Sequence, residues 1–491
     1  MQVRELLSPF TDFSLPACEI LSLTDDTRTA DATSLFVCIR GARFDGHTLA
    51  NVAYQNGCRF FVAERPISLP DDAIVVLVES TRTALSLLAS AFYRHPSRKL
   101  RVIAVTGTKG KTTVAQLIRG ILDANGIPTG YIGTNGIIYG KVKRSTSNTT
   151  PNPLTLQKTL SEMHEHGMHA AVIEVSSQAL LQSRVEGTQF EAAVFTNLSL
   201  DHVGPNEHSS FEDYTECKHR LFTDFNVKTA FWNADDAAHL QMRVGTSAKK
   251  EILYSATKKS ADYHAIDICA FHESTSLGIS FSVSNGEHSV PCRLPLVGVC
   301  NVSNALSAIA VVKELFGVSL SDAANALSAI RVDGRSECYP LPSGAIAVID
   351  YAHNEESLRS ILTSLREYKP RRLICVFGSV GERSQLRRAT LGAVASSLAD
   401  FSIITSDNPG NESPEKIIDE IAAAFDRSSY LGIADRREAI LYAASLSKKG
   451  DILLLAGKGH ETYQLIGDKK IPFDERQILS ELSTPLNITT D

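Results

Sequence analysis

The sequence lacks the features that mark several protein classes. Its nine cysteines are scattered singly with no CxxC pair, which argues against a disulfide framework and a structural zinc site. No apolar run approaches the roughly 18 residues of a membrane-spanning helix. Lysine and arginine number 49 against 55 aspartates and glutamates, so no basic surplus favours nucleic acid or acidic lipid. We therefore expect a cytoplasmic protein with no nucleic-acid partner and no membrane span. We also expect it to be a monomer.

The chain is long enough for several folded domains. Its 491 residues, 43% hydrophobic and 21% charged, can bury a core over most of their length. At about 150 residues per domain, this length predicts about three domains. The first 98 residues contain two short apolar runs, 34–39 and 75–78, that predict strands, and a helical period over 81–93. They predict a small N-terminal α/β domain.

A second domain is expected from 99 to 333. It opens with a β-branched run at 101–106, a glycine-rich turn and an amphipathic helix over 112–124. The apolar runs 170–175 and 192–197 predict buried parallel strands. Residues 251–295 change to an alternating pattern that is typical of antiparallel strands. The central domain is therefore predicted to be a P-loop ATPase-like parallel sheet with an appended antiparallel sheet.

A third domain is expected from 334 to 491. It follows a predicted helix over 321–330 and contains apolar strand candidates at 346–351, 373–378, 401–406 and 451–456, separated by helical stretches. This alternation predicts a doubly wound, Rossmann-like α/β domain. The whole chain is thus predicted to be an α/β protein of three domains.

The turn between the strand at 101–106 and its helix reads TGTKGKTT. Its glycines permit a tight turn, and backbone N–H groups at the helix N-terminus can face phosphate. Lys111 would reach the β- and γ-phosphates, and Thr112 would bind Mg²⁺. The loop is shorter than GxxxxGK[ST], and a chance glycine-rich turn is the alternative. The predicted ATP loop comprises Gly107, Thr108, Lys109, Gly110, Lys111, Thr112 and Thr113.

Eight motifs in order give the chain a more specific likeness. They are TGTKGKTT, NTTP, EVSS, NLSLDH, GVCNVSNAL, DYAHN, DNPG and GKGHE, and together they cover the chain from the phosphate loop to its C-terminal part. The set resembles the Mur ligase family, and within it the MurE type, the UDP-N-acetylmuramoyl-tripeptide synthetases. The resemblance implies an ATP-dependent ligase that joins a diamino acid to the D-Glu of UDP-MurNAc-L-Ala-D-Glu through an acyl phosphate.

The resemblance also implies roles for single residues. Catalytic positions would be Lys111, Glu174, His202, Lys218 and Arg335, and Mg²⁺ would be held by Thr112, Glu174, His202 and, if it is carbamylated, Lys218. ATP would further contact Asn301, Arg335, Asp350 and His353. The UDP-sugar-dipeptide would contact Thr27, Arg28, Gly46, His47, Asn148, Thr149, Thr150, Ser176, Gln182 and Arg184.

The acceptor amino acid would meet Arg383, Asp407, Asn408, Gly410, Glu412, Gly457 and Glu461. Diaminopimelate-adding relatives carry DNPR, whose arginine grips the second carboxylate, whereas this chain has DNPG. Loss of a charged hydrogen bond is worth roughly 1.5–3 kcal/mol. Glu412 and Glu461 favour a cation instead, and Arg383 remains for the α-carboxylate. The segments DHVGPNEHSSFEDY and TGTKGKTT also look like those of L-lysine-adding enzymes, so L-lysine is the predicted acceptor, with L-ornithine and meso-diaminopimelate as alternatives.

Two other functions stay open at this point. A folylpolyglutamate synthase shares the loop and the acyl-phosphate chemistry, but the TTP, EVSS and DNP set argues against it. A catalytically silent nucleotide-binding scaffold of cell-wall synthesis would fit the altered GERS and DNPG segments. Such a scaffold would not need the whole set of catalytic residues, which is intact here.

Overall fold

The computed structural model of the chain describes residues 1–12, 14–41, 44–200, 204, 207–381, 385–425 and 429–483. The chain divides into two compact units, Met1–Leu253 and Tyr254–Asp491. The first unit contains two sheets, and the second contains an antiparallel group of strands followed by a six-stranded sheet. Among the described residues, no helix combines the length and the apolar character that crossing a membrane requires.

The first sheet of unit 1 has four parallel strands in the order β1-β2-β3-β4. Helices α1 and α3 bury apolar side chains against one face of it, while α2 covers the other. The two predicted strands and the predicted helix are present, each within one or two residues of its expected bounds. The elements are β1 (Ser22–Thr24), β2 (Ser34–Val37), β3 (Phe60–Ala63), β4 (Ile74–Leu77), α1 (Val3–Leu7), α2 (Gly46–Gln55) and α3 (Thr81–Phe92).

The second sheet of unit 1 runs in the order β12-β11-β10-β5-β9-β6-β7-β8. Strands β11, β10, β5, β9 and β6 pair in parallel, and β7 and β8 add an antiparallel edge. The strands are β5 (Arg101–Thr106), β6 (Thr129–Gly133), β7 (Gly136–Tyr139), β8 (Val142–Arg144), β9 (Ala170–Glu174), β10 (Ala192–Phe195), β11 (Thr229–Asn233) and β12 (Lys250–Ser255).

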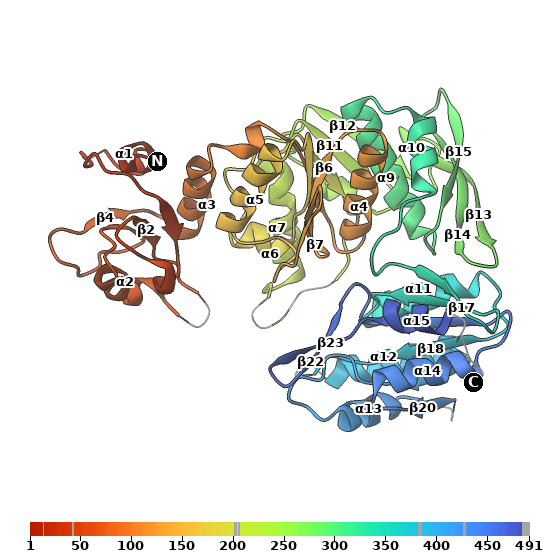
Figure 1. Cartoon of the computed structure of the whole chain (residues 1–491). Coiled ribbons are helices and arrows are strands. Elements are labelled where there is room, and N and C mark those ends of the chain that lie inside the picture. The colour runs from red at the N-terminus through yellow and green to blue at the C-terminus, as the bar shows by residue number, and fades with distance from the viewer. Residues whose placement is uncertain are drawn as a thin grey trace, which may run out of the picture. The chain divides into compact units, whose positions relative to one another are not determined.

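Helices cover both faces of this sheet, as Figure 1 shows. Helix α4 packs on one face against β5, β6 and β9, and α5 and α7 pack with a common apolar core on the other. The loops that follow β5, β9 and β10 therefore all open at the carboxyl edge, where ligands bind in such sheets. The helices are α4 (Lys111–Ala124), α5 (Pro153–Glu165), α6 (Ser177–Leu181), α7 (Phe211–Thr223) and α8 (His239–Met242).

Unit 2 begins with the antiparallel strands predicted within 251–295. Strand β14 pairs antiparallel with both β13 and β15. The last residues of β12 are an exception, because Tyr254 and Ser255 pair in parallel with β13, which alternation alone does not reveal. The elements are β13 (Tyr263–His272), β14 (Leu277–Ser284), β15 (Ser289–Leu294), α9 (Cys300–Phe316) and α10 (Leu320–Leu327).

The six-stranded sheet of unit 2 has the order β16-β17-β21-β18-β19-β20 and is parallel except for β16. Helices α11, α12 and α13 share an apolar core on one face, and α14 and α15 share one on the other, so the doubly wound prediction is confirmed. The elements are β16 (Glu337–Pro340), β17 (Ile346–Asp350), β18 (Leu373–Phe377), β19 (Phe401–Ile404), β20 (Tyr430–Gly432), β21 (Ile452–Ala456), β22 (Tyr463–Ile466), β23 (Lys469–Pro472), α11 (Glu355–Arg366), α12 (Gln385–Leu398), α13 (Pro414–Ala422), α14 (Arg436–Leu446) and α15 (Glu475–Ser483).

Candidate functional site

The TGTKGKTT loop lies between β5 and α4, the strand–loop–helix context that phosphate binding requires. Gly107 has a φ of 140°, and a Cβ there would meet the Thr196 hydroxyl oxygen at 2.0 Å, so only glycine fits this position. The loop is held from β10, because Asn197 accepts hydrogen bonds from the backbone N–H groups of Thr108 and Lys109 at 2.9 Å each. The turn is therefore rigidly placed at the N-terminus of α4, ready to receive an anion.

Glu174 lies behind this loop at the end of β9, with its side chain fully buried. Its carboxylate accepts hydrogen bonds from the Thr112 hydroxyl at 3.0 Å, from the Thr134 N–H and hydroxyl at 3.0 and 3.1 Å, and from the Tyr131 hydroxyl. Four donors compensate the burial of the charge. The structure thus brings together Thr112 and Glu174, two of the predicted Mg²⁺ ligands.

Two ammonium groups converge on one carbonyl of the loop. The Nζ of Lys111 lies 2.8 Å from the Gly107 carbonyl oxygen, and the Nζ of Lys218 lies 3.0 Å from the same atom. Lys218 reaches it from α7, is 1% exposed and has its Nζ 4.5 Å from the centre of the Tyr214 ring. Positive charge is therefore concentrated where the phosphates of a nucleotide would lie. His202 and Arg383, also predicted for the site, lie outside the described residues.

A pocket of about 170 Å³ lies in unit 1 between the four-stranded sheet and the α5 side of the larger sheet. Arg184, one of its lining residues, donates to the Thr150 carbonyl at 2.7 Å and to Gln182 Oε1 at 2.8 Å. The Thr150 hydroxyl in turn donates to the Glu174 carbonyl at 2.7 Å. The lining residues are Asp25, Ile39, Arg82, Leu85, Asn148, Asn152, Pro153, Gln182 and Arg184.

Of the residues predicted to contact the UDP-sugar-dipeptide, Asn148, Gln182 and Arg184 line this pocket, and the others do not. Thr150 and Ser176 are joined by a hydrogen bond of 3.3 Å, and Thr149 is linked to Thr134 at 3.2 Å. The four predicted residues of the first domain, Thr27, Arg28, Gly46 and His47, are absent from the pocket's lining.

Two of these four residues have clear structural partners. His47 is 6% exposed, with Nδ1 2.7 Å from Asp45 and Nε2 accepting the Glu64 N–H at 3.0 Å. The Arg28 side chain is 86% exposed and pairs with Asp26.

In unit 2, a second group of predicted residues gathers at the carboxyl end of β17. Asp350 accepts the Ser336 N–H at 2.9 Å, and burial raises the pKa of Asp350 although Arg335 opposes the shift. The Arg335 guanidinium carbon lies 5.2 Å from the centre of the Tyr351 ring. His353 Nδ1 lies 2.8 Å from the Tyr351 carbonyl oxygen. The Asn301 side-chain amide donates to the Val297 carbonyl, just before α9, and accepts from Asn304 within α9.

The predicted acceptor residues at the ends of β19 and β21 form one charged cluster. The buried Lys458 ammonium donates to Asn408 Oδ1 and Glu461 Oε2 at 2.8 Å each and lies 3.6 Å from Asp407 Oδ1. Gly457 is close beneath, since a Cβ there would lie 3.1 Å from the Asp407 carboxylate. Two carboxylates share one ammonium, which leaves the group with a net charge of −1.

Gly410 and Glu412 lie in the segment that follows this cluster. Gly410 has a φ of 59° and exchanges backbone hydrogen bonds with Leu465 and Gly467. Glu412, predicted to favour a cation on the acceptor, is already paired within the protein, because its carboxylate is 2.9 Å from the buried guanidinium of Arg388.

Sequence reasoning missed several residues that organise these clusters. Lys458 could have been found, since it lies inside the GKGHE motif between two predicted positions. Tyr131 and Thr134 lie between the TGTKGKTT and NTTP motifs and gave no signal. Tyr351 lies inside the DYAHN motif but was not singled out. Burial raises the pKa of Tyr351 to about 12, and the negative charges of Glu461 and Asp407 add to this rise. The Arg335 guanidinium lies over its ring, and the charges of Glu461 and Asp407 act on its hydroxyl.

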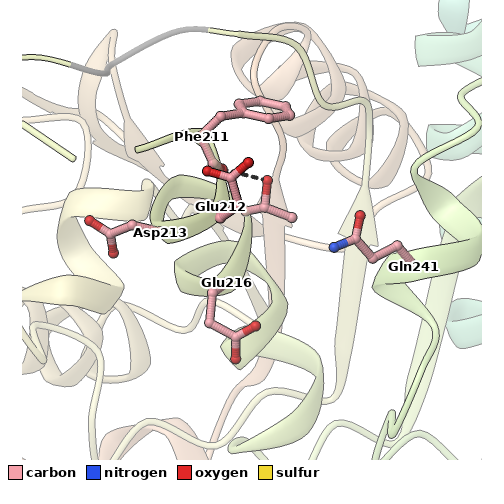
Figure 2. Close-up of a pocket in the computed structure, with 6 residues that line it drawn as sticks. Phe211, Glu212, Asp213, Glu216 and Gln241 are labelled. Carbon is pink, nitrogen blue, oxygen red and sulfur yellow. Dashed lines mark hydrogen bonds between the residues drawn. The ribbon is translucent and has the colours of Figure 1, made fainter. Parts of the chain in front are cut away.

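A larger hollow of about 550 Å³ lies over α7 and includes none of the predicted site residues. Figure 2 shows its carboxylates, Glu212, Asp213 and Glu216, with Gln241 across from them. The Thr215 hydroxyl donates to the Phe211 carbonyl at 2.7 Å, as expected within a helix. Three carboxylates repel phosphate, so this hollow is not part of the nucleotide site.

Comparisons with known proteins agree with this geometry. The Mur ligase middle domain matches residues 105–312, the Mur ligase glutamate ligase domain matches 334–459, and the Mur ligase family catalytic domain matches 19–93. The chain belongs to the Mur ligase family. It is accordingly an ATP-dependent amide ligase, and the central match begins in the phosphate-loop strand.

Curated relatives of this Mur ligase span nearly its whole length. The UDP-N-acetylmuramoyl-L-alanyl-D-glutamate--2,6-diaminopimelate ligase of Caldanaerobacter subterraneus subsp. tengcongensis is 39% identical over 469 residues, 95% of each chain. The protein of the same name from Bacillus licheniformis is 36% identical over 472 residues, 94% of each chain. A solved ligase of that name has a TM-score of 0.72 at 29% identity, with 98% of each chain covered.

More distant structures share the fold alone. MurF from Acinetobacter baumannii has a TM-score of 0.64 at 20% identity, covering 98% of each chain. A folylpolyglutamate synthase from Mycobacterium tuberculosis has a TM-score of 0.60 at 17% identity and covers 77% of this chain and 92% of its own.

Proposed function

We propose that this Mur ligase adds a diamino acid to the D-Glu of UDP-MurNAc-L-Ala-D-Glu in the cytoplasm, and that the diamino acid is L-lysine. The observation that carries the ligase chemistry is the convergence of Lys111 and Lys218 on the Gly107 carbonyl beside the Thr112–Glu174 pair. The curated relatives support this substrate, because their names specify the same dipeptide precursor. The domains are proposed to divide at residues 98 and 333.

The proposed reaction has two steps. A D-Glu carboxylate oxygen attacks the γ-phosphorus of ATP, so that ADP leaves and an acyl phosphate forms. The amine of the acceptor then attacks the acyl carbon, phosphate leaves, and the amine loses a proton. Negative charge lies beside phosphate oxygens in each step, so the lysines and the backbone N–H groups of the loop supply stabilisation and position.

The donors near the loop fit Mg²⁺. Thr112 and Glu174 offer a hydroxyl and a carboxylate, the oxygen ligands that this hard cation prefers. Bound Mg²⁺ would neutralise charge on the phosphate oxygens. An unmodified Lys218 ammonium offers no lone pair, so it would join the ligands only as a carbamate. His202 completes the proposed set.

The acceptor preference rests on the charge of the Lys458 cluster and on Gly410. Asp407 and Glu461 outnumber Lys458 by one negative charge, which favours a substrate that brings an ammonium. Gly410 supplies no guanidinium for a second carboxylate. L-lysine ends in an ammonium and has no second carboxylate, so it suits both features.

The rival acceptor is meso-diaminopimelate, which appears in the names of the relatives. It would need a cation for its second carboxylate. Arg388 is already paired with Glu412 and Glu420, and Lys458 is already shared. These pairings favour L-lysine, or its shorter homologue L-ornithine, over meso-diaminopimelate.

The test of the ligase proposal is phosphate release from ATP, measured with Mg²⁺ present and with each substrate omitted in turn. We expect release only when UDP-MurNAc-L-Ala-D-Glu and an amino acid acceptor are both present. The Lys111→Met variant removes the loop ammonium and should abolish turnover while the fold is retained. Nucleotide binding without any turnover, under every acceptor, would contradict the ligase proposal and favour a silent scaffold.

A further inference from the structure

Helix α3 presents a row of hydroxyl groups to the loop that follows α6. Thr83, Ser86 and Ser90 are spaced three and four residues apart and therefore share one face of the helix. The Ser86 hydroxyl donates to the Ser183 carbonyl, and the Ser90 hydroxyl donates to the Gly187 carbonyl at 2.9 Å. Both serines are buried, at 0% and 1% exposure, so these bonds are shielded from water.

The residue held most closely has an unusual backbone. Ser183 has a φ of 53°, in the left-handed region that residues other than glycine seldom adopt. Its side-chain oxygen also accepts a hydrogen bond from the Thr83 hydroxyl at 3.2 Å. Strained residues of this kind persist where surrounding contacts hold them, and they gather at binding sites.

Ser183 separates two polar residues that line the 170 Å³ pocket. Gln182 precedes it and Arg184 follows it, and the two side chains are hydrogen-bonded to each other. Burial lowers the pKa of Arg184, and the nearby charge of Arg82 adds to this shift. A guanidinium in such surroundings gains from an anionic ligand.

Helix α3 also contributes Arg82 and Leu85 to the lining of the same pocket. It lies beside α5 in Figure 1, and the two helices are in contact. The hydroxyl row thus joins α3, which contributes Arg82 and Leu85, to the loop that contributes Gln182 and Arg184, and the bonds to Ser183 lie one residue away from Arg184.

We propose that Ser86, assisted by Thr83, is a positioning residue that holds Ser183 in its left-handed conformation and thereby aims Arg184 at an anionic group of the nucleotide-sugar-dipeptide. This inference rests on the proposed function, since it concerns the binding of that substrate. Ser86 acts through Arg184 and does not touch the reacting atoms.

The first test compares Ser86→Ala with Ser90→Ala. Both changes remove a buried hydroxyl from α3, but Ser90 bonds at Gly187, three residues past Arg184, and does not line the pocket. We expect Ser86→Ala to raise the KM for UDP-MurNAc-L-Ala-D-Glu by about three- to tenfold, the net worth of one hydrogen bond. Its kcat and its KM for ATP should stay within about twofold of wild type, and Ser90→Ala should leave all three unchanged.

The second test is Ser183→Gly, which separates positioning from stability. Glycine adopts φ of 53° without strain, so the melting temperature should equal or exceed that of wild type. The KM for the nucleotide-sugar-dipeptide should nevertheless rise, because the backbone next to Arg184 is freed. A more stable variant with weaker substrate binding is not expected from a purely structural contact. This variant also decides the matter if Ser86→Ala does not fold.

The outcomes distinguish the inference from the function on which it rests. If the wild-type protein forms product while Ser86→Ala and Ser183→Gly keep the wild-type KM, the positioning role is wrong and the proposed function stands. Equal KM increases in Ser86→Ala and Ser90→Ala would also overturn it, because loosening of α3 in general would then be the cause. If the wild-type protein forms no product with any acceptor, the positioning role and the proposed function both fail.

Discussion

Replacement of Glu174 by glutamine separates the charge of this buried carboxylate from its role in the fold. Glutamine has nearly the same shape, and its amide oxygen can accept from Tyr131 and the Thr134 N–H as Glu174 does. Its amide nitrogen would face the hydroxyls of Thr112 and Thr134, which can rotate and accept. All four contacts can therefore be kept, and only the charge is lost.

The effect on stability should be small because two terms oppose each other. Four charge-assisted bonds become neutral ones, at a loss of about 1 kcal/mol each. Removal of a fully buried charge returns a desolvation penalty of several kcal/mol. We expect the free energy of unfolding to change by less than about 2 kcal/mol.

The effect on activity should be large. Without the carboxylate, the proposed Mg²⁺ site loses its charged protein ligand beside Thr112, and we expect kcat to fall by about 100-fold or more, at the upper end of losses seen around metal ligands. Tyr131→Phe is the matched control, because it removes one donor to Glu174 and keeps the charge. Steady-state kinetics over a Mg²⁺ titration would measure this. Activity of Glu174→Gln within threefold of wild type at every Mg²⁺ concentration would refute the reasoning.

Three further predictions concern unit 2. Arg436→Met should destabilise the protein by about 3–5 kcal/mol, because it leaves the fully buried Glu475 without its partner, and the added Glu475→Leu change should restore most of the loss in thermal unfolding. Burial raises the pKa of Asp451, but hydrogen bonds from Arg372 and Arg371 outweigh it and leave the pKa lowered. The ionised Asp451 carboxylate therefore stabilises the folded protein above its usual pKa of 3.8, and this stabilisation is lost as the pH falls through the lowered pKa of the folded state. The difference in free energy of unfolding between wild type and Asp451→Asn should therefore disappear in acid. Gly410→Arg should raise the ratio of kcat/KM for meso-diaminopimelate to kcat/KM for L-lysine by about tenfold or more. One charged hydrogen bond is worth roughly 1.5–3 kcal/mol, and the left-handed strain of an arginine at φ of 59° offsets part of that gain. An unchanged ratio in paired assays would contradict the role given to Gly410.

Periodicity identified the elements that carry buried apolar runs. The strand 101–106 and its helix were predicted to within one residue, because a β-branched run, a glycine turn and an amphipathic period all agree there. Short strands such as β8, with exposed Lys143 and Arg144, carry no apolar signal and were not foreseen. The parallel pairing of Tyr254 with Tyr263 depends on tertiary arrangement, which alternation does not encode.

The site could be predicted only where a motif carried it. Lys111, Thr112 and Glu174 were found because their motifs are contiguous, and the structure brings them together. The four donors around Glu174 come from separate segments, so no spacing rule connects Tyr131 with it. Glu412 was predicted to favour a cation on the acceptor. Its pairing with Arg388 was not foreseen, because Arg388 is 24 residues away in the chain and an ion pair at that separation is visible only in the folded protein.

The most direct measurement is a competition between acceptors. Purified protein would be given ATP, Mg²⁺ and UDP-MurNAc-L-Ala-D-Glu with L-lysine and meso-diaminopimelate at equal concentrations, and the mass of the nucleotide product would be read. The account predicts a product whose added mass is that of L-lysine less one water. A product that carries meso-diaminopimelate instead would contradict the acceptor assigned here, and the absence of any extended product would contradict the ligase itself.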